Sequence, residues 1–183
     1  MAQYSESGLF MYKKQTNPSA IYSQQLIKNA LLALMQKGAF KDISVSTLCN
    51  TAKVGRRTFY NNFETKEDVL SLIMDGYSEE FHELISHAAV SGLELFFQFW
   101  YARKDFLYLL KKNQLLSLVE DNLLNEMAQN LYKRYPKTIE NEYFINIASK
   151  SLCSILFTWL DRDFKDSIDE IDSIAHKYNY DVG

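Results

Sequence analysis

SVSTLCNTAKVGRRTFYNNF, residues 44–63, predicts two short helices joined by a tight turn. Small and apolar residues recur at helical spacing in its first half: Val45, Leu48, Cys49 and Ala52. Ser44 stands where it can cap this first helix. A second helical run follows the break at residues 53–55, and its Phe59 and Phe63, four residues apart, share the side that faces the core. The stretch is therefore expected to fold as a helix-turn-helix.

The exposed face of the second helix suits the major groove of DNA. At about 100° per residue, the face opposite the two phenylalanines carries Arg57, Thr58 and Asn61, with Arg56 and Tyr60 on its flank. Arginine offers paired donors to guanine and asparagine pairs with adenine, while threonine and tyrosine reach phosphate or a thymine methyl. These residue types predict a DNA-reading helix.

The same stretch resembles the helix-turn-helix of the TetR family of bacterial transcription regulators. The matching positions run in unbroken register: Ser44-Val45, Leu48-Cys49, residues 52–55, residues 57–60, Phe63 and Thr65-Lys66-Glu67. In the TetR-like pattern the matching lysine contacts a phosphate, and the resemblance gives that role to Lys66. The predicted DNA-contacting residues are Ser44, Ser46, Gly55, Arg56, Arg57, Thr58, Tyr60, Asn61, Asn62 and Lys66.

Three positions depart from the family pattern. Lys53 stands where the family usually has the turn glycine, so we expect it in the left-handed conformation at a cost of roughly 1 kcal/mol. Gly55 replaces a serine and gives up a side-chain cap. Arg57 replaces a glycine, so the DNA site should differ from those of relatives that lack this arginine.

The composition predicts an all-α protein with a basic N-terminal part. Two prolines and six glycines interrupt 183 residues, and apolar residues follow the helical period. The net charge is −3, yet residues 13–66 hold nine basic and two acidic residues, a net of +7. Residues 67–183 hold eleven basic and twenty acidic residues, a net of −9. This segregation is typical of a protein that presents one end to phosphate.

We expect three parts: a flexible arm over residues 1–16, a three-helix DNA-binding domain over 17–65, and a helical regulatory and dimerisation domain over 66–183. Asn17 and Pro18 begin a helix that ends near Gly38. Further helices are predicted from about residue 65 to 88, then over 93–101, 104–112, 115–135, 139–164 and from 167 on. Gly76, inside the first of these, is interpreted as a packing notch.

The helix over residues 139–164 is apolar around nearly its whole circumference, and such a helix must be buried on two sides. One side can pack on its own domain, and we expect a second copy of the chain on the other. TetR-like proteins dimerise through their last two long helices, so the resemblance implies a homodimer that spaces two recognition helices over a palindrome. The predicted interface residues are Leu152, Ile155, Leu156, Trp159, Ile171 and Ile174.

The C-terminal part is rich in aromatic residues, which fits either a packed core or the small-molecule pocket that TetR-like regulators often hold. Its sequence also resembles the subgroup that includes regulators of dihydroxyacetone kinase genes, in which a protein partner takes the place of a diffusing effector. The leading hypothesis is a dimeric DNA-binding regulator, of the repressor kind most common in the family. The alternative is a co-activator or adaptor whose C-terminal domain docks a protein.

No pattern favours an enzyme, a cofactor or a metal site. His82-Glu83 lacks the second histidine of the H-E-x-x-H zinc motif, because Ser86 occupies that position. Cys49 and Cys153 lack metal-ligand spacing and are expected to be buried thiols in a reducing compartment. Neither a secretory signal nor a membrane-spanning apolar run is apparent, so we expect a cytoplasmic protein.

Overall fold

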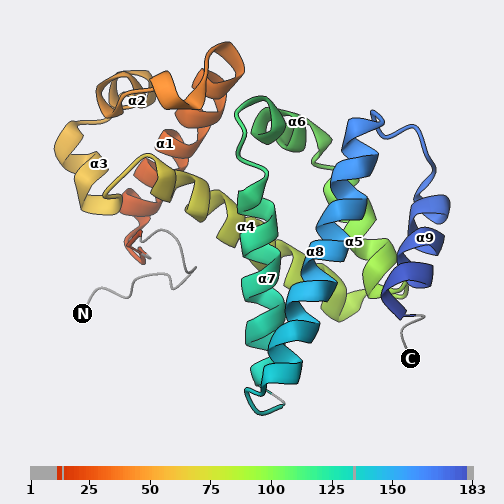
Figure 1. Ribbon diagram of the computed structural model, residues 1–183. Coiled ribbons are helices and arrows are strands. Elements are labelled where there is room, and N and C mark those ends of the chain that lie inside the picture. The colour runs from red at the N-terminus through yellow and green to blue at the C-terminus, as the bar shows by residue number, and fades with distance from the viewer. Residues whose placement is uncertain (1–11, 14, 134, 181–183) are drawn as a thin grey trace. The chain divides into compact units, whose positions relative to one another are not determined.

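The computed structural model describes residues 12–13, 15–133 and 135–180, and within these ranges it is all-α, as predicted (Figure 1). The N-terminal elements are α1 (Pro18–Lys37), a 3-10 turn η1 (Phe40–Asp42), α2 (Val45–Ala52), α3 (Arg56–Asn62) and α4 (Glu67–His87). The C-terminal helices are α5 (Gly92–Tyr101), α6 (Lys104–Lys112), α7 (Ser117–Tyr132), α8 (Ile139–Asp161) and α9 (Ile168–Tyr180). The chain divides into two compact units, one ending at Gly76 and one beginning at Tyr77.

The predicted helix starts are confirmed by their caps. The Asn17 side chain accepts from the Ser19 backbone N–H at 2.9 Å, and Pro18 occupies the first turn of α1. At the start of α4, Asp68 accepts from the backbone N–H of Thr65 at 2.8 Å, while the Thr65 hydroxyl accepts from that of Asp68 at 3.3 Å. Ser167 and Glu170 make the same reciprocal pair before α9.

The N-terminal unit extends further along the chain than the predicted boundary at residue 65. Val69, Leu70 and Ile73, on the first turns of α4, are buried, and so are Ile27 and Leu31 of α1 in the same unit. These turns supply part of the core that the helix-turn-helix needs. The unit boundary therefore falls inside α4, at Gly76, rather than at its start.

Gly76 is not the packing notch that we expected. The residue is exposed, and a Cβ built on it would meet no atom within 4 Å. Gly76→Ala should therefore raise the free energy of unfolding by about 0.5–1 kcal/mol, because alanine restricts the unfolded chain and suits a helix interior. Urea unfolding of the two proteins measures this difference. A destabilised variant would show that glycine is needed at this position.

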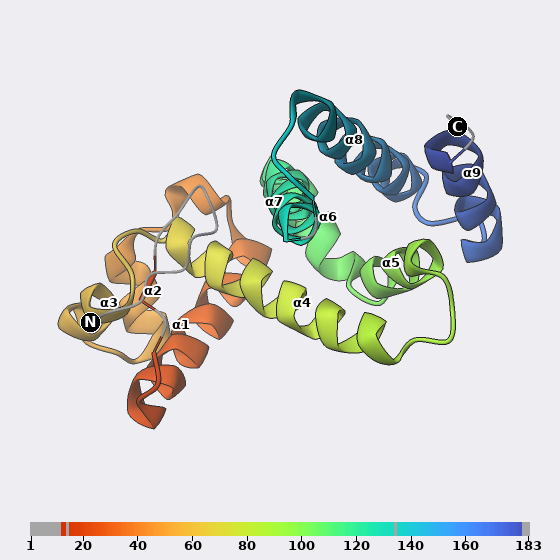
Figure 2. The same ribbon diagram turned by 90° about the horizontal axis from the view of Figure 1, so that it is seen from below.

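The C-terminal unit is built on two packed helix pairs. Helices α7 and α8 lie side by side in Figure 1, and α5 packs against α9, as the second view shows (Figure 2). Trp159, near the end of α8, is buried, and its indole N–H donates to the Asp166 carbonyl at 2.9 Å. Its ring meets that of Phe164 with centroids 4.9 Å apart. These contacts hold the turn between α8 and α9.

Helix α8 has one buried face and one exposed face. The exposed face is apolar over the first half of the helix, at Ile139, Tyr143, Phe144 and Ile147, and carries serine and threonine beyond it. Within the described part of the chain, α8 alone is long and apolar enough to cross a membrane by length and composition. Those two properties are shared by the core helices of water-soluble proteins, and the buried face of α8 packs like a core helix.

Both cysteines are free and buried, as expected. Burial raises the pKa of each thiol, and that of Cys153 reaches about 12. Both side chains are therefore protonated at neutral pH and fill space in the core.

Candidate nucleic-acid interface

The turn between α2 and α3 has the geometry predicted from its sequence. Ser44 caps α2 by accepting from the Thr47 backbone N–H at 3.0 Å. Lys53 ends the helix in the left-handed conformation, with φ 54° and ψ 39°, as expected for the residue in place of glycine. The Val54 N–H then donates back to the Cys49 carbonyl at 3.0 Å, which closes the end of α2 and turns the chain toward α3.

Helix α3 is fixed by two buried aromatic rings. Phe59 and Phe63 are almost completely buried, with ring centroids 5.6 Å apart. The ring of Tyr12 packs against Phe63 at 6.3 Å, so a segment before α1 also supports this side of α3. Because one side of the helix is anchored in this way, its opposite side is held outward.

The outward side of α3 carries the predicted base-reading side chains. Arg57 and Asn61 are exposed, as is Tyr60, of which 54% is accessible. Arg56 is exposed as well, and its guanidinium donates to the Ser46 hydroxyl, which joins α3 to α2. The remaining donors of Arg56 stay available to a nucleic acid. Ser44 and Gly55 are also exposed, and Ser46 and Thr58 are half-buried.

Asn62 does not belong to this surface, contrary to the prediction. Its side chain is 2% exposed, and its amide nitrogen donates to the Thr58 carbonyl at 2.8 Å. The Lys13 backbone N–H donates to the Asn62 carbonyl at 3.1 Å and covers this end of the helix. A side chain so enclosed cannot reach DNA in this conformation.

Lys66 also has a different role from the one carried over from the family pattern. Its ammonium donates to three backbone carbonyls, those of Phe40, Lys41 and Ile43, at 2.7, 3.1 and 2.9 Å. An ammonium has three N–H donors, and all three are used. Lys66 therefore ties the start of α4 to the η1 turn and has no donor left for a phosphate.

Replacing Lys66 should accordingly affect stability more than DNA binding. Lys66→Met leaves three carbonyls without their charged donor, so we expect the free energy of unfolding to fall by about 2–4 kcal/mol. The exposed neighbour Lys41 offers the control, because Lys41→Met removes the same charge and no such bonds. Urea unfolding measures both variants. Equal losses in the two would contradict the role assigned to Lys66.

The expected flexible arm is ordered where the structure describes it. Tyr12 is 3% exposed, and its hydroxyl donates to the Asp75 carboxylate at 2.9 Å. The Gln24 amide donates to the Lys13 carbonyl at 3.0 Å. The prediction of a mobile arm is therefore corrected at Tyr12 and Lys13, while residues 1–11 and 14 lie outside the described residues. The periodicity of the sequence carries no sign of this contact, because Tyr12 precedes any helix.

Solved structures with a similar fold include three transcription regulators. The TetR transcriptional regulator from Streptococcus agalactiae 2603V superposes with a TM-score of 0.62 at 20% identity, over 88% of this chain and 95% of that one. The fatty acid degradation regulator FadR from Bacillus halodurans gives 0.54 at 18% identity, over 90% and 95%. The dihydroxyacetone kinase operon activator DhaS gives 0.50 at 24% identity, over 85% and 92%.

This chain therefore has the fold of a TetR transcriptional regulator. Over 80 residues it is also 40% identical to the HTH-type dhaKLM operon transcriptional activator DhaS of Lactococcus lactis subsp. lactis (strain IL1403). That match covers 44% of this chain and 39% of the length of DhaS. No family model matches the chain.

The TetR fold places the six predicted dimer residues in two groups. Leu152, Leu156, Trp159 and Ile171 are buried within their own unit, so their side chains are not available to a second chain in this conformation. Ile155 is half-buried and Ile174 is 42% exposed. The available apolar surface lies instead on the first half of α8, where Ile139 is 75% and Ile147 is 64% exposed. The sequence correctly showed that α8 is apolar on most sides, but three of the four α8 residues chosen for the interface lie on its buried face.

Proposed function

We propose that this chain is a sequence-specific DNA-binding transcription regulator that acts as a homodimer on a palindromic site. The observation that carries the proposal is the outward face of α3, where Arg57, Tyr60 and Asn61 are exposed opposite the buried Phe59. Within the described residues no ion pair of Arg57 is present, and the Asn61 side chain is exposed, so both can meet base edges. The TetR fold and the sequence similarity to DhaS support the same role.

A second copy of the chain is proposed on the exposed apolar face of α8. Ile139, Tyr143 and Ile147 follow one another at four-residue spacing, so they lie in one row. Ile174 and Tyr178 of α9 are also exposed and apolar. Monomeric proteins rarely expose a row of large apolar side chains such as that on α8, and a twofold axis would bury the same row on both copies.

Selection of duplexes from a random library by the purified chain tests the proposal. We expect an enriched inverted repeat whose half-sites are centred about one DNA turn, roughly 34–36 Å, apart or a multiple of it. Because most of the affinity for DNA comes from phosphate contacts, the selection should be run at near-physiological salt. Failure to enrich any sequence would overturn the proposal.

The chain has two candidate effects on transcription, repression and activation. Repression was the prediction from the family pattern, whereas the similar protein DhaS is named as a transcriptional activator, which makes activation the second candidate. A reporter placed behind the selected site separates the two. Expression that falls when the chain is supplied indicates a repressor, and expression that rises indicates an activator.

A further inference from the structure

The N-terminal unit has a polar hollow of about 410 Å³ beside α3. Its nine lining residues come from the segment before α1, from the first turns of α1 and from α3. All of them are polar except Ala20, Lys13 is the one cation, and no carboxylate is among them. Ammonium, amide and hydroxyl groups donate hydrogen bonds to the oxygens of an anion. The composition of the hollow therefore favours an anionic partner.

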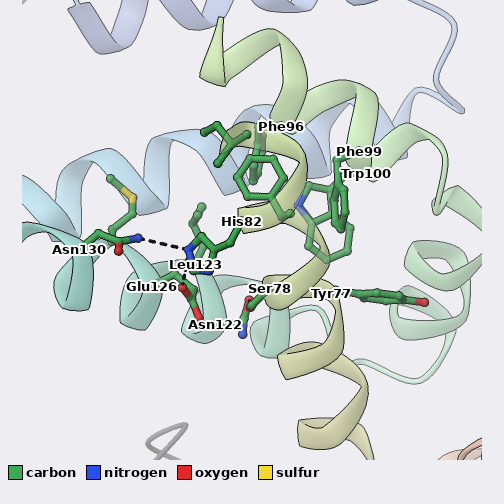
Figure 3. Close-up of a pocket in the computed structure, with 13 residues that line it drawn as sticks. Tyr77, Ser78, His82, Phe96, Phe99, Trp100, Asn122, Leu123, Glu126 and Asn130 are labelled. Carbon is green, nitrogen blue, oxygen red and sulfur yellow. Dashed lines mark hydrogen bonds and ion pairs between the residues drawn. The ribbon is translucent and has the colours of Figure 1, made fainter. Parts of the chain in front are cut away.

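The cavity of the C-terminal unit has the opposite character (Figure 3). Aromatic rings such as Phe96 and Trp100 line it, and neither lysine nor arginine does. Its one carboxylate is Glu126 of α7, which lies 3.1 Å from Nε2 of His82 on α4. Of the two, the hollow in the N-terminal unit is the one whose cation suits a phosphate.

Lys13 is held beside α3 by its backbone. Its N–H donates to the Asn62 carbonyl at 3.1 Å, and its carbonyl accepts from the Gln24 amide at 3.0 Å. Two residues further on, the Gln15 amide donates to the Asn61 carbonyl at 3.4 Å. The Lys13 side chain is half-buried, and within the described residues its ammonium makes no ion pair. The backbone is therefore already ordered, and the charge remains available to a ligand.

A DNA strand passes this hollow when α3 lies in the major groove. With its side chains a helix is about 10–12 Å across, and the groove is about 12 Å wide, so a sugar-phosphate strand flanks the helix on each side. Asn61 is exposed on the outward side of α3 and also lines the hollow. A strand beside Asn61 therefore runs over the hollow that Lys13 lines.

We propose that Lys13 binds one backbone phosphate of the DNA in each half-site, in the hollow beside α3. The inference rests on the proposed function, because it requires α3 in the major groove. Lys66, which the family pattern assigns to a phosphate, donates to three backbone carbonyls instead, so Lys13 supplies a cation that Lys66 does not. A phosphate contact fixes the position of the protein on the duplex without reading its sequence.

The salt dependence of DNA affinity tests the role of Lys13. Lys13→Gln removes the charge and keeps both backbone hydrogen bonds, since these involve no side-chain atom of Lys13. On the duplex that the unchanged chain selects, the plot of log affinity against log salt should become shallower by about 0.9 for each bound copy, or about 1.8 for the proposed dimer. The loss of affinity should then be about tenfold larger at 50 mM than at 200 mM salt. An unchanged slope would overturn the proposal.

Two further variants separate this contact from a general effect of charge. Lys13→Arg keeps the cation, so its slope should stay within about 0.3 of the unchanged chain. Lys37→Gln removes an exposed charge from the other end of α1, about 21 Å beyond Ser23 at 1.5 Å per residue, and should also leave the slope unchanged. Equal changes of slope in Lys13→Gln and Lys37→Gln would contradict a site at Lys13.

Ethylation interference locates the phosphate. Ethylation removes the charge of one phosphate at a time, so the positions at which it blocks binding mark the contacts. Lys13→Gln should lose the interference at one phosphate in each half-site and keep the interference elsewhere. The same pattern in both proteins would contradict the proposal.

Selection from the random library separates this inference from the proposed function. Lys13→Gln should enrich the same sequence as the unchanged chain, because a phosphate contact carries no sequence information. If the unchanged chain enriches no sequence, the proposed function fails and the inference fails with it. If the unchanged chain enriches a palindrome while Lys13→Gln keeps its salt slope and its interference pattern, the inference alone fails.

Discussion

The double variant Arg56→Ala, Arg57→Ala is expected to lose at least about a thousandfold in affinity for the selected DNA site. Both arginines are exposed at the start of α3 and offer paired donors to base or phosphate oxygens. Each well-placed contact contributes about 1–3 kcal/mol, and a dimer makes four of them, so even the lower value reaches this loss. Gel-shift titration of both proteins on one duplex measures it.

The fold should survive this double change, because neither side chain is part of the core. Lys104→Ala with Lys165→Ala is the matched control, since it removes the same two charges from exposed positions in the C-terminal unit. We expect the control to bind within about threefold of the unchanged chain, because distant exposed charges are screened by salt. If the arginine variant binds DNA as tightly as the control does, α3 is not part of the interface.

The second large effect is expected at the exposed face of α8. Ile147→Asp places a charge at the C-terminal end of the apolar row, and an unpaired charge in a closed interface is strongly unfavourable. The chain should change from a dimer to a monomer of 21.3 kDa in sedimentation equilibrium. Its affinity for the palindrome should fall at least about a hundredfold, because two half-sites then bind independently.

Gln129→Asp is the control for this experiment, since it adds the same charge at an exposed position of α7. It should leave the mass and the DNA affinity unchanged. If Ile147→Asp remains a dimer, the interface lies on another surface. An unchanged chain that is already monomeric would end the proposal of a homodimer.

Local features of this fold could be predicted from the sequence because their causes are local. The caps at Asn17 and Ser44, the reciprocal pair of Thr65 and Asp68, and the left-handed Lys53 each depend on residues within a few positions. Helical periodicity likewise placed Phe59 on the inner side of α3 and Arg57 on the outer side. Each of these predictions needs only the residues of a single helical turn.

The failures have a common physical origin in contacts between distant segments. Lys66 was assigned to phosphate because its position in the motif is visible, whereas the three carbonyls that bind it lie more than twenty residues earlier. Asn62 looked like a surface amide, but residues before α1 cover it. Neither contact can be recognised from the helical periodicity of the sequence.

The sequence likewise could not predict which apolar residues of a long helix are buried. Leu156 and Ile147 are both apolar residues of α8, yet Leu156 is completely buried and Ile147 is exposed. The positions of the helices that pack against α8, which are α6, α7 and α9, decide between them. The pairing of His82 with Glu126 was missed for the same reason, since it joins residues 44 positions apart.

The most direct test of the central claim, that the outward face of α3 reads base pairs, is to repeat the selection from a random library with Arg57→Ala. We predict that the enriched palindrome keeps its overall form and loses its preference at one matching position in each half-site. A variant that selects the same sequence with the same preference at every position would show that Arg57 reads no base.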